Sequence, residues 1–230
     1  IDLLIFYWYS MSLFRNTNSN YSRPSLFGGF HFFPPVIKTL LLANGTVYIL
    51  TAFFGMFRVG DYHLAEFIDS VFALWPLDSN VPNIPTFQIW QLFTYMFMHA
   101  GFTHLFFNMF ALWMFGMELE NTWGSKKFFL YYLLCGIGAG VSNLVVGPIF
   151  GQGGPTVGAS GAIYGILLAF GLLFPERPIF LYFFIPIRAK YFVLIFMALE
   201  IFAGVTGTQD GVAHFAHLGG MLGGWLLTRY

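Results

Sequence analysis

The chain has 230 residues, of which 57% are hydrophobic and only 9% carry a charge. Because a soluble domain has about 25% charged residues, this composition excludes a mostly water-facing surface and indicates an integral, multi-pass membrane protein. Basic and acidic residues balance at ten each, so the charge gives no indication of a nucleic-acid partner. Cys135 is the single cysteine, which excludes an intrachain disulfide and a cysteine-based metal site.

Residues 1–35 are expected to lie apart from the membrane core. The opening run "IDLLIFYWYSMSLF" is apolar but short for a span of about 20 residues. It also lacks the basic start and the small-residue cleavage site of a signal peptide. We interpret it as an interfacial segment, followed by a polar tether, "RNTNSNYSRPSLFGG".

Residues 36–230 are predicted to form one core, an all-α bundle of six transmembrane helices. The apolar segments that predict these helices are 36–57, 104–118, 128–146, 158–174, 191–207 and 212–228. An insertion at about residues 58–103 separates the first two segments. Its charges, aromatic residues and prolines are typical of a loop at the membrane surface.

Basic residues predict the orientation of this bundle. With the N-terminus inside, nine of the ten lysines and arginines fall on the inner side, and Arg58 alone lies outside. Cytoplasmic loops retain lysine and arginine, so both termini are predicted to be cytoplasmic, an N-in and C-in topology.

In this orientation, five polar side chains come to one layer in the outer leaflet. Ser160 begins the fourth segment, His217 lies in the sixth, and His99, His104 and Asn108 lie at or just before the second. Polar groups in hydrocarbon are costly unless they are paired, and they are functional by default. A lone serine or histidine usually serves helix packing, so the convergence indicates a site more strongly than any one residue does.

Small residues predict that the fourth and sixth segments cross closely. Gly158 and Gly161 flank Ser160, permit a tight entry into the helix and leave its N-terminal N–H groups free to face a developing negative charge. A close crossing would bring the imidazole of His217 to the hydroxyl of Ser160, as a general base requires. The facing residues are Ser160, Gly161, Tyr164 and Gly165 on one helix and His217, Gly220 and Gly224 on the other.

The other ionisable groups leave alternatives open. Six histidines could bind a metal, but no His-Glu-x-x-His pair exists and Glu200 has no obvious metal partner, so we expect no metal and no other cofactor. No aspartate lies at the depth of the serine. Glu200 is the only candidate third member of a triad, and a lateral helix face suits it at least as well, which favours a Ser160–His217 dyad. His214 is expected at the rim of the cavity, with no chemical step.

Three linked motifs, "HAGFTHLFFNMFALWMFG", "GASGAIYG" and "AHFAHLGGMLGG", resemble those of the rhomboid intramembrane serine proteases. The resemblance covers about residues 36–230. It implies that Ser160 is the nucleophile and His217 its general base, while His104, Asn108 and the Ser160 N–H bind the oxyanion. It also implies supporting roles, namely a structural histidine (His99), a tyrosine stacked on the catalytic histidine (Tyr164) and glycines of the helix contact (Gly220 and Gly224).

Two positions depart from the family pattern. Trp90-Gln91 stands where relatives often have Trp-Arg, and Glu120-Asn121-Thr122 stands where they often have an acid-x-Arg pair. The missing ion pair is expected to affect the stability of the loop and to spare the catalytic centre.

The resemblance also implies a function. An endopeptidase of this family would cleave transmembrane substrates near the outer leaflet, and the substrates would enter sideways from the lipid bilayer between the second and fifth segments. Substrate helices with Gly or Pro near their outer end are expected, because they unwind at lower cost. A bacterial cytoplasmic (inner) membrane is the expected location. The competing class is a non-enzymatic chaperone or small transporter, because intramembrane histidines can relay protons.

Overall fold

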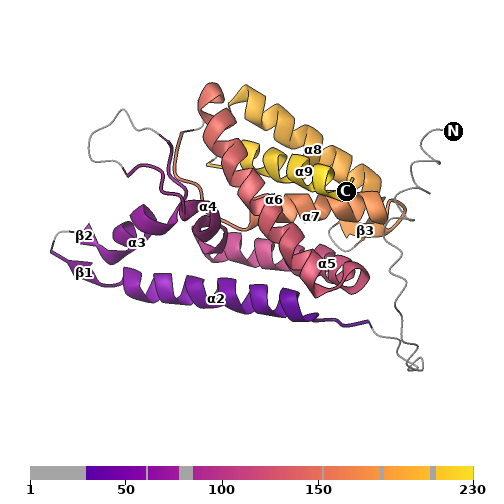
Figure 1. Ribbon diagram of the computed structural model, residues 1–230, viewed down its shortest axis with the longest axis horizontal. Coiled ribbons are helices and arrows are strands. Elements are labelled where there is room, and N and C mark those ends of the chain that lie inside the picture. The colour runs from indigo at the N-terminus through magenta and orange to yellow at the C-terminus, as the bar shows by residue number, and fades with distance from the viewer. Residues whose placement is uncertain are drawn as a thin grey trace.

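The computed structural model describes residues 30–60, 62–77, 85–151, 153–181, 184–207 and 211–229, most of which are helical (Figure 1). The α-helices are α2 (Pro35–Gly55), α3 (Leu64–Phe72), α4 (Gln91–Thr94), α5 (Phe102–Trp123), α6 (Ser125–Val146), α7 (Ser160–Leu173), α8 (Ala189–Thr206) and α9 (His214–Thr228). The predicted interfacial segment near the N-terminus lies outside the described residues.

Short elements connect these helices. Two 3-10 turns are η1 (Tyr95–Phe97) and η2 (Gly147–Phe150). Two antiparallel hairpins pair β1 (Arg58–Val59) with β2 (Tyr62–His63), and β3 (Pro178–Leu181) with β4 (Ile185–Arg188). The first hairpin, α3, α4 and η1 all lie in the insertion predicted between the first two apolar segments.

Each apolar segment predicted from the sequence overlaps one of the longer helices, α2, α5, α6, α7, α8 and α9. By length and composition, three described helical stretches could each cross a membrane alone, Pro35–Gly55, Ser125–Phe150 and Ala189–Thr206. A fourth crossing results if Gln91–Phe97 and Phe102–Trp123, which meet at a bend of 97°, count as one span. The structure therefore shows a mostly helical membrane protein, and the count of six spans stays a prediction.

Helix α7 occupies the centre of the bundle and packs against α5, α6, α8 and α9. Because neighbours surround it, it is apolar on nearly every face. Its 14 residues rise about 21 Å, less than the roughly 30 Å of a hydrocarbon core. Ala159, just before its first residue, is fully buried. The N-terminus of α7 therefore begins inside the bundle.

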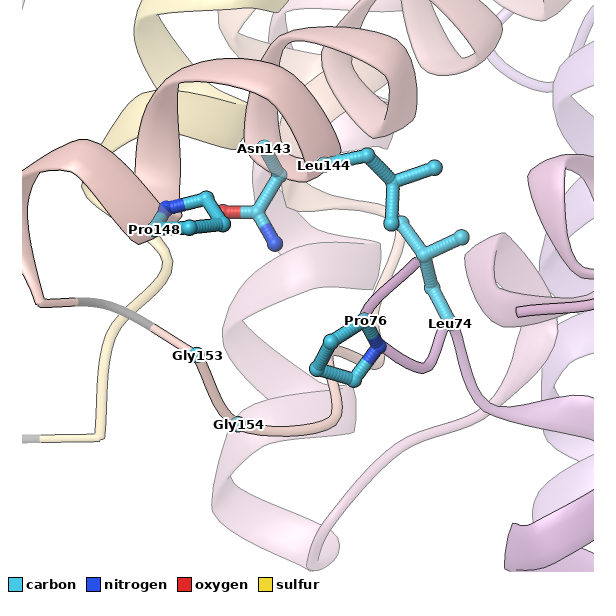
Figure 2. A pocket seen from close by; sticks show the side chains of 7 residues that line it. All are labelled: Leu74, Pro76, Asn143, Leu144, Pro148, Gly153 and Gly154. Atoms are coloured by element: carbon cyan, nitrogen blue, oxygen red, sulfur yellow. The ribbon is translucent and has the colours of Figure 1, made fainter. Parts of the chain in front are cut away.

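The loop that leads into α7 is tied to the insertion. Leu74 and Thr156 exchange two backbone hydrogen bonds of 2.9 Å, and the N–H of Gly158 donates to the carbonyl of Tyr95 at 2.9 Å. The side chain of Asn143 donates to Oγ1 of Thr156 at 2.9 Å. A small hollow beside this junction contains no predicted site residue (Figure 2). Its lining residues are Leu74, Pro76, Asn143, Leu144, Pro148, Gly153 and Gly154.

Gln91, the first departure from the family pattern, holds the insertion together. The side chain is completely buried at the start of α4. Its Oε1 accepts hydrogen bonds from the N–H groups of Trp75 at 3.2 Å and Gln88 at 3.1 Å. Its Nε2 faces the carbonyls of Ser70 at 3.4 Å and Val71 at 3.3 Å. One neutral side chain thus satisfies four backbone groups of the loop.

Glu120, the acid of the second departure, binds a helix N-terminus. It is 2% exposed near the end of α5, and its two carboxylate oxygens accept the N–H groups of Val36 at 2.9 Å and Ile37 at 2.8 Å. The hydroxyl of Ser125 donates to the same carboxylate at 2.6 Å. A negative charge at the first turn of α2 complements the helix dipole. Glu120 therefore connects α2, α5 and α6 without an arginine.

Candidate active site

Ser160 is the first residue of α7, two positions after a glycine with a left-handed backbone. Gly158 has a φ of 123°, and a Cβ built on it would lie 2.7 Å from Nε2 of His104. Any other residue here would strain the backbone and collide with that ring. The first N–H groups of α7 have no acceptor within the helix, so the positive end of the helix dipole lies at the serine.

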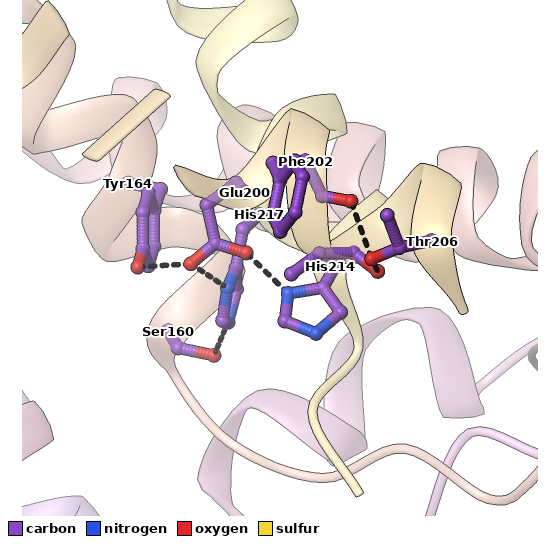
Figure 3. Close-up of polar contacts among 8 residues, drawn as sticks. Ser160, Tyr164, Glu200, Phe202, Thr206, His214 and His217 are labelled. Carbon is purple, nitrogen blue, oxygen red and sulfur yellow. Dashed lines mark hydrogen bonds and ion pairs between the residues drawn. The ribbon is translucent and has the colours of Figure 1, made fainter. Parts of the chain in front are cut away.

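His217 on α9 lies directly against Ser160, with 2.8 Å between its Nε2 and the serine Oγ (Figure 3). Its side chain is buried, with 8% of the residue exposed. The two helices meet through glycines, because a Cβ on Gly220 would lie 1.8 Å from the carbonyl oxygen of Gly161. Gly224 similarly faces the backbone of Gly165. The predicted close crossing of these segments is present.

Tyr164 lies one turn after Ser160 and covers the imidazole of His217. The two rings are stacked, with 4.1 Å between their centroids and 11° between their planes. A flat contact of this kind restricts rotation of the imidazole about its χ2 angle. Tyr164 therefore holds the ring plane in which Nε2 meets the serine.

Glu200 on α8 lies beside Nδ1 of the same imidazole, so of the two positions that the sequence left open for it, the lateral helix face is wrong. The residue is 8% exposed, and its Oε1 lies 3.0 Å from Nδ1 of His217. The Tyr164 hydroxyl donates to Oε1, and Nδ1 of His214 lies 2.7 Å from Oε2 (Figure 3). Ser160, His217 and Glu200 thus form a row of three side chains, where the sequence favoured an isolated pair.

His214 is also placed differently from its prediction. It is 5% exposed, so it lies within the buried cluster and not at a rim. Together Glu200, His214 and His217 each offer one ligand atom, and these atoms lie within 4.8 Å of one another. Two nitrogens and one oxygen are a donor set that Zn²⁺ accepts. The interpretation that Glu200 lacks metal partners is therefore wrong.

The predicted oxyanion residues lie on one face of α5. His104 reaches Gly158, and the ring of His99 packs against that of His104 with 5.1 Å between centroids. Asn108 is 7% exposed, and its amide nitrogen donates to the His104 carbonyl at 2.8 Å. Among the described residues, neither His104 nor Asn108 hydrogen-bonds to Ser160. Their oxyanion role stays a prediction.

Comparison with known proteins identifies the family. A model of the rhomboid domain matches residues 86–230, which include all three motifs. The chain belongs to the rhomboid family. It is 28% identical over 215 residues to RHOMBOID-like protein 1 from Arabidopsis thaliana, covering 85% of this chain and 52% of that relative.

Two further rhomboid relatives come from a bacterium and a yeast. Rhomboid protease GluP from Bacillus subtilis is 35% identical over 139 residues, which are 59% of this chain and 25% of the relative. Rhomboid protein 1, mitochondrial, from Saccharomyces cerevisiae is 31% identical over 176 residues, which are 70% of this chain and 51% of the relative. The chain therefore spans about half the length of these relatives or less.

Proposed function

We propose that this rhomboid chain is an intramembrane serine endopeptidase, with Ser160 as nucleophile and His217 as general base. The observation that carries the proposal is the 2.8 Å contact between Nε2 of His217 and Oγ of Ser160. A base must lie within hydrogen-bond reach of the proton it removes, and this pair meets that requirement. Named rhomboid proteases among the relatives support the same activity.

The reaction follows from this geometry. Oγ of Ser160 attacks the scissile carbonyl while its proton passes to Nε2 of His217. The Ser160 N–H, His104 and Asn108 stabilise the resulting oxyanion. The C–N bond then breaks as His217 returns the proton to the leaving amine. Water then attacks the acyl carbonyl and loses a proton to Nε2 of His217. The ester C–O bond breaks as His217 returns that proton to Oγ of Ser160, which restores the free enzyme.

We place the site in the outer leaflet, with both termini cytoplasmic. Two contacts support this orientation. Arg177 pairs with Glu118 at 2.8 Å, and Glu120 binds the start of α2, so the basic residue that follows α7 lies at the same end of the bundle as the end of α5 and the start of α2. Ser160 begins its helix away from that end. Location in a bacterial inner membrane stays a prediction, since one matched relative is named as mitochondrial.

The proposed substrates are transmembrane segments that enter from the bilayer between α5 and α8. A helix must unwind before its amide reaches Ser160. Segments with Gly or Pro near the outer end, and a small residue before the cut, should therefore be cleaved faster than a polyleucine span. Equal rates for both kinds of segment would contradict this part of the proposal.

The deciding experiment compares purified wild type with Ser160→Ala and His217→Ala on a model transmembrane substrate in liposomes. Both variants should form no product, and both should lose labelling by a fluorophosphonate. Ser142→Ala is a matched control, because it removes a hydroxyl from α6 and leaves the site intact. Product from Ser160→Ala would refute the assignment. A non-enzymatic chaperone or transporter would leave the wild-type protein unlabelled.

A further inference from the structure

Glu200 is a buried carboxylate with more partners than helix packing requires. It lies on α8, and the residues that contact it, Tyr164 on α7 and His214 and His217 on α9, come from the two helices of the site. An ionised carboxylate within a membrane bundle is costly unless donors compensate it. Here, the Tyr164 hydroxyl and the rings of His214 and His217 converge on its two oxygens (Figure 3). The cluster therefore holds a negative charge beside the base.

The contact with Ser160 determines which nitrogen of His217 carries the proton. Nε2 must present a lone pair to remove the serine proton, so the neutral ring must carry its hydrogen on Nδ1. In the described part of the chain, Nδ1 makes no aligned hydrogen bond, and Oε1 of Glu200 lies 3.0 Å away. This is ion-pair distance, and catalytic contacts of this kind commonly tighten only in the transition state.

The positive charge that forms during the reaction lies between these groups. When His217 accepts the serine proton at Nε2, the ring becomes an imidazolium with Nδ1–H directed to Glu200. The carboxylate then compensates the new charge without accepting the proton. Tyr164 and His214 keep the carboxylate in place by occupying Oε1 and Oε2.

We propose that Glu200 is a positioning residue that completes a Ser160–His217–Glu200 triad. The inference rests on the proposed peptidase function and replaces the two-residue arrangement expected from the sequence. Glu200 fixes the tautomer of His217 and stabilises its protonated form, so it contributes to the chemical step. A role limited to joining α8 to α9 would contribute only to stability.

The test measures kcat, KM and the thermal midpoint for Glu200→Gln and Glu200→Asp. The amide of Gln offers Nδ1 a donor, which favours the wrong tautomer of His217. In triad enzymes, the equivalent change lowers kcat by about 10⁴-fold. We expect kcat of Glu200→Gln to fall by at least about 100-fold with little change in KM, and Glu200→Asp to recover part of it.

Glu120→Gln is the matched control. Both glutamates are buried. Glu120, however, binds the start of α2, and within the described residues its hydrogen bonds do not include His217 or Ser160. Glu120→Gln should lower the thermal midpoint and leave kcat per folded molecule unchanged. If Glu200→Gln behaves in the same way, Glu200 is structural and the triad is refuted. If Glu200→Gln keeps the wild-type kcat while Ser160→Ala is inactive in the same assay, the triad is refuted but the peptidase proposal still stands.

Two further measurements keep the inference testable. If Glu200→Gln does not fold, the rate of fluorophosphonate labelling of His214→Gln and Tyr164→Phe replaces it, and wild-type rates for both would overturn the proposal. A metal held by Glu200, His214 and His217 is the competing explanation of the cluster. Loss of wild-type activity in EDTA, with recovery on adding Zn²⁺, would likewise overturn the triad. Unchanged activity in EDTA supports it.

Discussion

Gly220→Ala should separate α7 and α9, the two helices that carry Ser160 and His217. The new Cβ would lie 1.8 Å from the Gly161 carbonyl oxygen, whereas real Cβ atoms essentially never approach closer than 3.0 Å. The backbones must therefore separate by about 1.2 Å, since neither contacting group is a flexible side chain. A shift of this size directed along the contact would open the 2.8 Å distance from Ser160 to His217 to about 4 Å, beyond hydrogen-bond range.

The expected cost has two parts. Misplacing a catalytic group by about 1 Å lowers the rate by about 10²-fold. Overpacking lowers the free energy of unfolding by about 1–3 kcal/mol. We would measure kcat/KM on a model transmembrane substrate, the labelling rate of Ser160 and the thermal midpoint.

Gly223→Ala is the control for the same helix. Its new Cβ would lie 3.9 Å from the Cα of Cys135, an ordinary contact. This variant should keep wild-type kcat/KM and gain up to about 1 kcal/mol in stability from helix propensity. Wild-type activity and stability in Gly220→Ala would refute the argument that the glycine contact sets the distance between serine and histidine.

Other substitutions test the surroundings of the site. Gly158→Ala should abolish labelling of Ser160, because its backbone φ of 123° and its contact with His104 both oppose a Cβ; labelling at the wild-type rate would contradict this. Gln91→Leu should lower the free energy of unfolding by about 1–3 kcal/mol, because part-buried backbone groups lose their partners. Chemical denaturation would measure it, with exposed Ile89→Ala as control, and an unchanged midpoint would count against the assigned role of Gln91.

The sequence determined the class of the protein and predicted the contact between Ser160 and His217. Composition predicts a membrane protein because lipid tolerates few charges, and the structure contains helices of the required length. The pairing of Ser160 with His217 was predictable because both residues lie on faces marked by small residues. The position of the glycines indicates which face of each helix meets the other helix, as well as the depth of the contact in the membrane.

Tertiary structure alone decided where Glu200 and His214 point. Helix α8 is apolar on nearly all its faces, so hydropathy gives the depth of Glu200 but not its direction around the axis. One signal was present, since the lone acid within an apolar helix needs a partner and His214 and His217 are three residues apart. The role of Glu120 depended on α2 and α5 meeting across 84 residues of sequence. Such contacts form only when the helices pack, because local sequence determines helices and packing determines their neighbours.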